Sequence, residues 1–368
     1  MKKLAFLLIL ILVSISVIGQ KSNNQKKEIL IQSFPIEKEL SGYNIDIPIS
    51  TKYMGVVDSL LIIVTRDNRY KIHIYNTEDM TLVKKVGREG KGPGEFVGGV
   101  KYFNQYEIDN DDINIWIFDV TTRKFQLINL TSLLSKRPKP PKQSISIDRT
   151  TNFEFGIFSI SENYIVGTSS SNKESYYWKK RENVLKGHFF RRDLRDGSIE
   201  WTVPRPELSF KYRSQCGVIY QDFPGMKPDK SKIAAANKYF SKIDVYKGSG
   251  ELDFSIKIPS EKMNLVLPNS SDWFKENHQY YGSCSVSDDY IYALYKNTSF
   301  DAFYESDFEP EIHVFDWDGN PICRYRLKIP LDHIAVDEKT RTIFGGHDVT
   351  DGGITVFKMG DELSFHHH

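Results

Sequence analysis

The sequence predicts an all-β protein, and more specifically a six-bladed β-propeller whose last blade is closed by a strand from the N-terminus. Three observations lead to this prediction. Short runs of alternating apolar residues, each of strand length and rich in β-branched and aromatic types, recur along the chain. No comparably long stretch repeats its apolar residues every 3.6 positions, as an amphipathic helix would. One type of strand returns about every 56 residues, which is typical of a propeller blade with extended loops.

Individual strands are expected where these apolar runs lie, and the turns between them carry glycine and aspartate. The clearest runs lie at 60–65, 70–76, 113–119, 124–130, 188–194, 242–247, 290–296, 311–317 and 353–359. The recurring strand starts near Ile72, Phe125, His188, Ile243, Ile312 and Ile354. Hairpin turns are expected at Asp196-Gly197 and Asp318-Gly319, because both residue types tolerate positive φ. Residues 260–279 are the best helical candidate.

Grouping the strands gives six blades, of which the last is incomplete. The groups lie at 53–87, 100–148, 153–203, 212–258, 280–328 and 332–359. The sixth group contains only three strands, so its fourth strand must come from elsewhere in the chain. Residues 29–34 form an unassigned apolar run of the right length, and we expect them to complete this blade. Such closure removes an exposed sheet edge that would invite aggregation.

The first 19 residues have the layout of a secretory signal peptide. Lys2 and Lys3 precede an uncharged, nearly all-apolar run at 4–18, and Val17 and Gly19 are small enough for a cleavage site. The apolar run is shorter than the ~20 residues that a membrane span needs. We therefore expect cleavage, no membrane span in the mature chain, and a location in the periplasm or outside the cell.

One domain is expected to follow the signal peptide, spanning residues 20–363. Residues 364–368 end in three histidines and are treated as a tail or the remnant of a tag. The first cysteine is Cys216, so no cysteine stands at the cleavage site to carry a lipid. The three cysteines include no C-x-x-C pair and are expected to be buried thiols, with a Cys216–Cys284 bridge as an alternative.

Charge and motifs exclude several classes of function. With 49 basic and 48 acidic residues the chain lacks the basic excess of a nucleic-acid binder, so no nucleic-acid partner is expected. The glycine-rich segment 87–94 has no G-K-[ST] ending and contains Pro93, which favours an interblade turn over a phosphate loop. Residues 316–320 lack the twelve-residue frame of a calcium loop, which favours a hairpin turn. No G-x-S-x-G motif is present.

No cofactor is expected from these motifs, but acidic side chains leave one catalytic alternative. Asp58, Asp109, Asp288 and Asp337 lie near the ends of inner strands. Such carboxylates could surround the central channel and hold calcium or another divalent metal. The alternative function is therefore a propeller hydrolase or lyase with a metal bound in the channel.

The predicted lengths of the connections favour binding at one face of the propeller. The long connections at 169–187, 296–311, 203–213 and 259–279 all fall on the same face, and loops on a rigid scaffold often carry function. The candidate ligand-binding residues are Arg88, Tyr177, Trp178, Lys179, Trp273, His278, Phe303 and Tyr304. We expect a non-enzymatic scaffold that binds a protein, peptide or glycan of the cell envelope. The open alternatives are that these aromatic residues only pack the loops onto the ring, or that the protein is purely structural.

Three segments also resemble a known family. Residues 86–96 look like the blade-linking motif of NHL-type propellers, and 280–296 and 312–337 look similarly familiar. Together they resemble the TolB-like six-bladed β-propellers common among exported proteins of the Bacteroidetes. The resemblance implies a six-bladed ring and an exported protein, and it supplies no catalytic residue.

Overall fold

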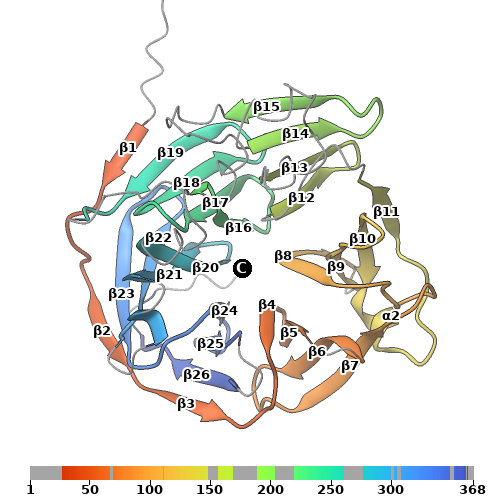
Figure 1. The fold of residues 1–368 in the computed structure, drawn as a ribbon, viewed down its shortest axis with the longest axis horizontal. Coiled ribbons are helices and arrows are strands. Elements are labelled where there is room, and N and C mark those ends of the chain that lie inside the picture. The colour runs from red at the N-terminus through yellow and green to blue at the C-terminus, as the bar shows by residue number, and fades with distance from the viewer. Residues whose placement is uncertain are drawn as a thin grey trace, which may run out of the picture.

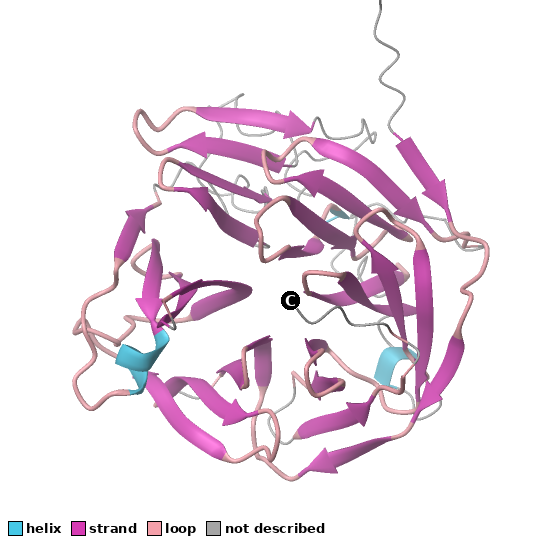
Figure 2. Cartoon of the chain, turned by 180° about the vertical axis from the view of Figure 1, so that it is seen from behind, coloured by secondary structure: helices cyan, strands magenta, loops and turns pink. Residues whose placement is uncertain are grey.

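Six small sheets form a ring around a central axis, which confirms the predicted six-bladed β-propeller (Figure 1). The computed structural model describes residues 27–363 except 67–68, 111, 148–155, 169–188, 204–218, 261–276, 300–301, 305–307, 349–351 and 362. Seen from behind, strands make up nearly all of the regular structure (Figure 2). The helical pieces include α2 (Leu130–Leu134) and the 3-10 turn η2 (Ala302–Tyr304).

Each blade is an antiparallel meander, numbered here from one to six in chain order. Blade one contains β4 (Thr51–Val57), β5 (Leu60–Thr65), β6 (Tyr70–Asn76) and β7 (Leu82–Arg88). Blade two contains β8 (Val100–Asp109), β9 (Asp112–Asp119), β10 (Lys124–Asn129) and β11 (Gln143–Ser146). Blade three contains β12 (Gly156–Ser161), β13 (Tyr164–Thr168), β14 (Phe189–Asp193) and β15 (Ile199–Val203).

The remaining blades take up strands from the N-terminus. Blade four contains β16 (Asp222–Met226), β17 (Lys232–Asn237), β18 (Lys242–Lys247), β19 (Leu252–Lys257) and, outermost, β1 (Lys27–Leu30). Blade five contains β20 (Gln279–Val286), β21 (Tyr290–Thr298), β22 (Glu311–Asp316), β23 (Pro321–Leu327) and, outermost, β2 (Glu37–Leu40). Blade six contains β24 (His333–Asp337), β25 (Thr342–Gly346), β26 (Ile354–Lys358) and β3 (Gly42–Ile45).

The core lies between the blades, and this explains why the inner strands are continuously apolar. In β5, Ile62 and Val64 pack against blade two, whereas Leu61 and Ile63 pack against blade six. All four side chains are buried, because a strand between two neighbouring blades is covered on both faces. Burial of each such side chain contributes about 1.5–3 kcal/mol.

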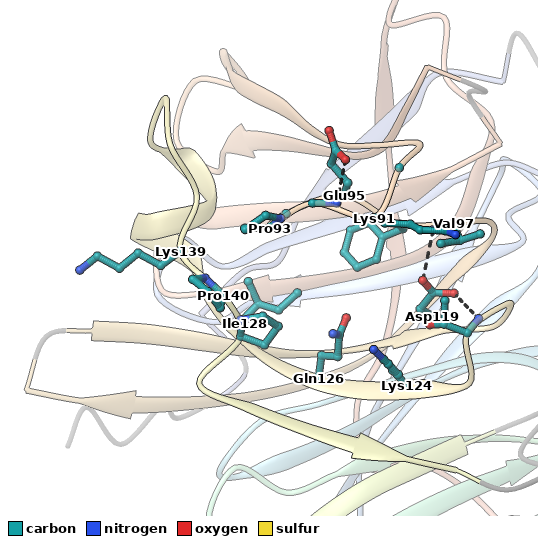
Figure 3. Close-up of a pocket in the computed structure, with 16 residues that line it drawn as sticks. Lys91, Pro93, Glu95, Val97, Asp119, Lys124, Gln126, Ile128, Lys139 and Pro140 are labelled. Carbon is teal, nitrogen blue, oxygen red and sulfur yellow. Dashed lines mark hydrogen bonds between the residues drawn. The ribbon is translucent and has the colours of Figure 1, made fainter.

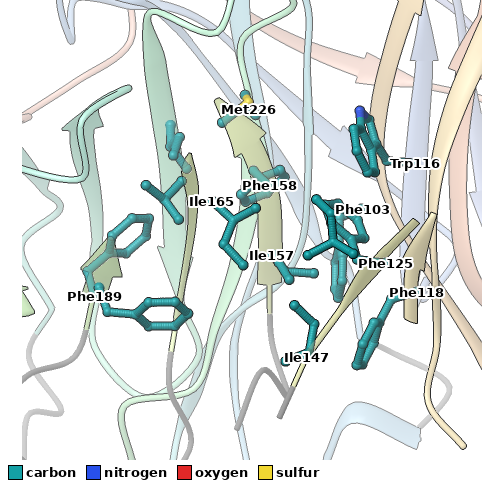
Figure 4. Close-up of a cluster of buried hydrophobic side chains, with 14 of the residues drawn as sticks. Phe103, Trp116, Phe118, Phe125, Ile147, Ile157, Phe158, Ile165, Phe189 and Met226 are labelled. Atoms are coloured by element: carbon teal, nitrogen blue, oxygen red, sulfur yellow. The ribbon is translucent and has the colours of Figure 1, made fainter. Parts of the chain in front are cut away.

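Aromatic side chains fill the space where blades two, three and four meet (Figure 4). Trp116 stacks on Phe125 with ring centroids 4.4 Å apart, and Phe103 meets Phe158 edge to face. Phe158 is fully buried. Packing between neighbouring blades therefore accounts for part of the high aromatic content of the sequence.

The N-terminal closure of the last blade is confirmed, but the strand predicted for it was wrong. Residues 42–45, in β3, pair antiparallel with β26 and supply the fourth strand. Residues 29–34 belong to blade four instead, where β1 pairs in parallel with β19. The apolar character of this run comes from Ile31 and Phe34, which are buried against blades four and five.

Residues 27–45 thus form a belt along the rim of blades four to six (Figure 1). After β1, the chain adds β2 in parallel to β23 and then closes the ring with β3. Leu40 is buried between blades five and six. Ion pairs fasten the belt along its length, including Lys257–Glu28 at 2.6 Å and Lys328–Glu39 at 2.7 Å.

Candidate functional site

The inner strands of the propeller surround a pocket of about 260 Å³ near its axis. Five of the six blades contribute side chains, among them Lys52, Asn104, Gln221, Ser283 and His333. A second pocket, of about 220 Å³, adjoins the first and shares Gln221 and His333 with it. We refer to these two spaces together as the axial pocket.

The axial pocket lies on the face that the loop lengths predicted for binding. Lys52 and His333 stand at the starts of innermost strands, whereas Arg66 and Asp348 follow the second strands of their blades. In an antiparallel meander, the start of the first strand and the end of the second lie at the same edge of the sheet. This edge also carries the strand ends at which the connections between blades begin and end, so the axial pocket lies at that edge.

Charged side chains of blades one, five and six form a network in the pocket. Lys296 of β21 pairs with Asp332 across 3.3 Å, and the backbone N–H of Asp348 donates to the other oxygen of Asp332. Arg66 pairs with Asp348 at 2.6 Å. Burial alone would raise the pKa of Asp332, but the Lys296 ammonium and the Asp348 N–H hold it below its usual value. Asp332 is therefore an ionised anchor for Lys296.

Lys238, which follows β17, brings a second ammonium group into the same space. Its Nζ donates to Oε1 of Gln221 at 3.4 Å. Burial, together with the nearby charge of Lys296, lowers the pKa of Lys238 to about 8. The two lysines thus line one pocket while repelling each other.

Two histidines add neutral polar groups. Burial lowers the pKa of His333 to about 4 and also lowers that of His347. Both rings are therefore uncharged at neutral pH, but only His333 lines the axial pocket, whereas His347 contacts the hydroxyl of Thr355. His333 lines both parts of the pocket.

Phe303 is the sequence-predicted candidate that the structure brings into this site. It belongs to η2, is buried, and has its ring centroid 3.6 Å from the Lys296 ammonium. A cation over an aromatic face at this distance is stabilised by the ring quadrupole. The burial of Phe303 also agrees with the alternative that such aromatic residues pack the loops onto the propeller. Phe303 therefore both lines the pocket and packs its own loop segment onto the propeller.

The other candidates do not line the axial pocket in the described part of the chain. Arg88 ends β7 and donates to the hydroxyl of Tyr70 at 2.7 Å, away from the axis. His278 precedes β20 and faces Tyr280, with ring centroids 6.2 Å apart. Tyr304 ends η2, and its side chain lies outside the description. Tyr177, Trp178, Lys179 and Trp273 lie outside the described residues.

The axial-pocket residues that the sequence did not predict are charged residues at strand ends. They are Lys52, Arg66, Lys238, Lys296, Asp332 and Asp348. A usable signal was present, because Lys296 directly follows the apolar run YIYALY and Asp332 directly precedes the strand HIAVD. The carboxylates predicted as channel ligands, such as Asp109 and Asp337, lie instead at the opposite ends of the inner strands.

The glycine-rich segment forms an interblade turn, as predicted. Residues 90–97 lie beside β10 and residues 139–141, around a pocket of about 360 Å³ (Figure 3). The N–H of Gly92 donates to the Glu95 carboxylate, and the N–H of Phe96 donates to the carbonyl of Arg88. These amides are used within the loop itself and do not form a phosphate cradle.

The structure also describes the turn at residues 316–320 and two of the three cysteines. The N–H groups of Asp318 and Asn320 donate to the Asp316 carboxylate, and Gly319 has a φ of +86°, so this segment is a hairpin turn. Among the described residues, Cys284 and Cys323 are free thiols. Cys216 itself lies outside the described residues.

The donor groups needed for a channel metal are not assembled in the described ranges. No three His, Cys, Asp or Glu side chains converge there closely enough to hold a metal ion. Asp337 uses its Oδ1 to accept the N–H of Thr340 in a turn. The carboxylates considered for the channel therefore do not form such a group. Across the same ranges, no helix is long and apolar enough to cross a membrane.

Comparisons with known proteins agree with this architecture. The sequence model of a family described as TolB-like 6-blade propeller-like matches residues 26–339. A solved member of the duf4221 family from Bacteroides vulgatus is similar in structure, with 13% identity and a TM-score of 0.55, covering 87% of this chain and 97% of that one. No curated protein matches the sequence.

Two further solved structures are more distant. A structural genomics protein of unknown function from Bacteroides thetaiotaomicron has 13% identity and a TM-score of 0.45, covering 89% of this chain and 75% of that one. The WD40 repeats of RRP9 have 9% identity and a TM-score of 0.45, covering 89% and 99%. At such identities the likeness concerns the fold alone.

Proposed function

Because this chain belongs to the TolB-like six-bladed propeller family, we propose that it is a non-enzymatic binding scaffold whose partner docks at the axial pocket. The family fold by itself does not decide the function, since propellers carry many unrelated activities. The proposal therefore depends on the chemistry of the site.

The observation that carries the proposal is the convergence of five blades on one polar pocket. The pocket combines charged groups with the apolar walls of Phe223 and Phe303. Ligand sites are typically concave and mostly apolar, with a few converging polar groups. Both parts of the pocket are smaller than the ~300–1,000 Å³ usual for a drug-sized ligand. Each part therefore suits one side chain or sugar-sized group of a larger partner.

The partner we propose is a protein, peptide or glycan of the cell envelope. The chain's balanced charge gives no reason to propose a nucleic acid. On this proposal the protein acts in the periplasm or outside the cell, where the signal peptide expected over residues 1–19 would direct it.

Nothing in the pocket favours the catalytic alternative. Burial raises the pKa of Cys284 to about 12, so its thiol is not a nucleophilic thiolate near neutral pH. The hydroxyl of Ser283 accepts the N–H of Ile334 and serves as a link between blades five and six. A metal-dependent hydrolase or lyase has no ligand set among the described side chains.

Filling the pocket tests the proposal. Gln221 lies outside regular structure and contacts both parts of the pocket, so Gln221→Trp should occlude them without disturbing a strand. Asp318→Trp is the matched control, because this exposed turn residue lies on the opposite face. Partners captured from envelope extract should be retained by the control and lost by Gln221→Trp. Equal capture by both variants would contradict the proposal.

A further inference from the structure

We infer that the axial pocket recognises the carboxylate of an acidic peptide side chain, with Lys238 as the group that pairs with it. The inference rests on the proposed function and adds the chemical class of what enters the pocket. Four observations support it: the charge balance of the site, the surroundings of Lys238, an unused acceptor on Asp348, and the size of the space.

The charge balance leaves Lys238 without a counter-charge. Lys296 is paired with Asp332, and Arg66 is paired with Asp348. In the described part of the chain, no carboxylate lies within ion-pair distance of the Lys238 ammonium, which donates a hydrogen bond to the amide oxygen of Gln221. The 220 Å³ space, whose other ammonium group is paired with Asp332, therefore has room for one additional negative charge.

The surroundings of Lys238 make that negative charge favourable. A partly buried ammonium is poorly solvated, and the neighbouring ammonium of Lys296 destabilises it further. A carboxylate bound between the two lysines would compensate both effects. The Lys238 ammonium also lies 5.3 Å from the ring centroid of Tyr239, which helps to orient the side chain.

The acids of the pocket favour a single negative charge over a phosphate. Asp332 and Asp348 line the same space as the two lysines. A doubly charged phosphate would place its second charge close to these carboxylates, and Lys238 is the one cation lining the 220 Å³ space that has no carboxylate partner among the described residues. A carboxylate carries only the one charge that this space lacks.

Asp348 and the pocket walls favour a peptide over an acidic sugar. Oδ1 of Asp348 is buried and accepts no hydrogen bond from the described residues, and a peptide N–H next to the acidic side chain could supply the missing donor. Phe223 and Phe303 line the 220 Å³ space and suit the methylene groups of that side chain. A hydroxyl-rich ring would need more polar partners than these walls offer.

The test uses small probes and the full mature chain. Calorimetry or NMR titration would compare a blocked peptide Ala-Glu-Ala, its Ala-Gln-Ala counterpart and glucuronate. The glutamate peptide should bind, the glutamine peptide should bind at least tenfold more weakly, and glucuronate should not compete. Tenfold corresponds to about 1.4 kcal/mol, at the lower end of a hydrogen bond to a charged group.

Variants assign the effect to Lys238. Lys238→Met should weaken binding of the glutamate peptide at least tenfold, whereas Lys238→Arg should restore most of it. Lys339→Met removes the same charge from an exposed turn on the opposite face and should leave binding unchanged. A melting temperature for each variant separates loss of binding from loss of folding.

The outcomes distinguish this inference from the proposed function. Equal binding of the two peptides, or no effect of Lys238→Met on binding, would overturn the inference of a carboxylate ligand. The proposed scaffold function would still be supported if the Gln221→Trp variant no longer captured its partner. If glucuronate bound through Lys238 and the glutamate peptide did not bind, the inference that the carboxylate comes from a peptide would be overturned. Partner capture unaffected by Gln221→Trp would overturn the scaffold itself.

Discussion

The guanidinium of Arg324 in β23 pairs with the carboxylate of Glu37 in β2 at 2.5 Å, joining the belt to the fifth blade. Arg326 reaches the same carboxylate at 3.0 Å. On its inner side, Arg324 lies 3.6 Å from Glu311, which in turn contacts the buried ring of His313 at 2.9 Å. The belt is thus connected to the interior of blade five through alternating charges, and its position on the rim is specific.

The first prediction concerns which part of the belt closes the ring. Removing residues 27–40 should lower the melting temperature, because Ile31, Phe34 and Leu40 lose their burial, worth about 1.5–3 kcal/mol each. The protein should nevertheless unfold cooperatively as a monomer, because β3 still completes blade six. Removing residues 27–45 should expose the edge of β26 and cause aggregation. Calorimetry and size-exclusion chromatography of the two truncations check this, and identical behaviour would contradict it.

The second prediction concerns the aromatic core between the blades. Phe158→Ala should destabilise the protein by about 3–5 kcal/mol, because the fully buried ring leaves a cavity. Tyr43→Ala is a suitable control, since Tyr43 is 56% exposed on β3. Urea unfolding followed by tryptophan fluorescence measures both. A loss below about 1 kcal/mol for Phe158→Ala would show that the cluster is not packed as described.

The third prediction is a loss of peptide binding in alkaline solution. The free protein holds Lys238 at a pKa of about 8, so this group loses its proton, and its attraction for a carboxylate, as the pH rises above that value. The charged or titratable groups facing it are Lys296, Asp332, His333 and Asp348. Affinity for the glutamate peptide should therefore fall between pH 7 and pH 9.

Lys238→Arg is the control for this pH profile, because a guanidinium keeps its charge throughout the range. Its affinity should remain nearly constant between pH 7 and pH 9. An identical decline in the wild-type protein and in Lys238→Arg would assign the pH dependence to another group.

The fourth prediction concerns stability in acid. Burial lowers the pKa of His333 to about 4, whereas an unfolded histidine titrates near 6.5. Between these values the unfolded chain takes up a proton that the folded chain does not, so stability is complete above pH 6.5 and declines as the pH falls toward 4. Urea unfolding at pH 7 and pH 4.5 should show a smaller decline for His333→Gln than for the wild-type protein.

The carboxylates also lose their pairing in this range, and the comparison with His333→Gln separates their contribution from that of the histidine. If the variant lost as much stability as the wild-type protein, the ring of His333 would not be held neutral by burial.

The sequence predicted the blades well because each inner strand is buried on both faces. Continuous apolar runs such as LLIIVT in β5 identify such strands without any tertiary information. The closing strand β3 was not predicted, because it lacks such a continuous apolar run. β3 has the sequence GYNI, is only four residues long and leaves Tyr43 exposed, so it has no apolar signature, whereas the stronger run at 29–34 follows blade four.

The site was less predictable because it is assembled from residues far apart in the chain. Arg66 and Asp348 are separated by 282 positions and meet only when the ring closes. The sequence analysis did single out Phe303, which lines the axial pocket. It could not show that Lys238 and Lys296, from different blades, would line one space.

The belt also determines the order in which the chain can complete its fold. Its strands pair with residues 254–257, 324–327 and 354–357, so β1 finds its partner only after blade four has been made, and β3 only after blade six has been made. Contacts of such long sequence separation carry a high loop-closure entropy and form slowly. Blades one to three can collapse locally during synthesis, whereas the belt strands can pair only after blades four, five and six have been made.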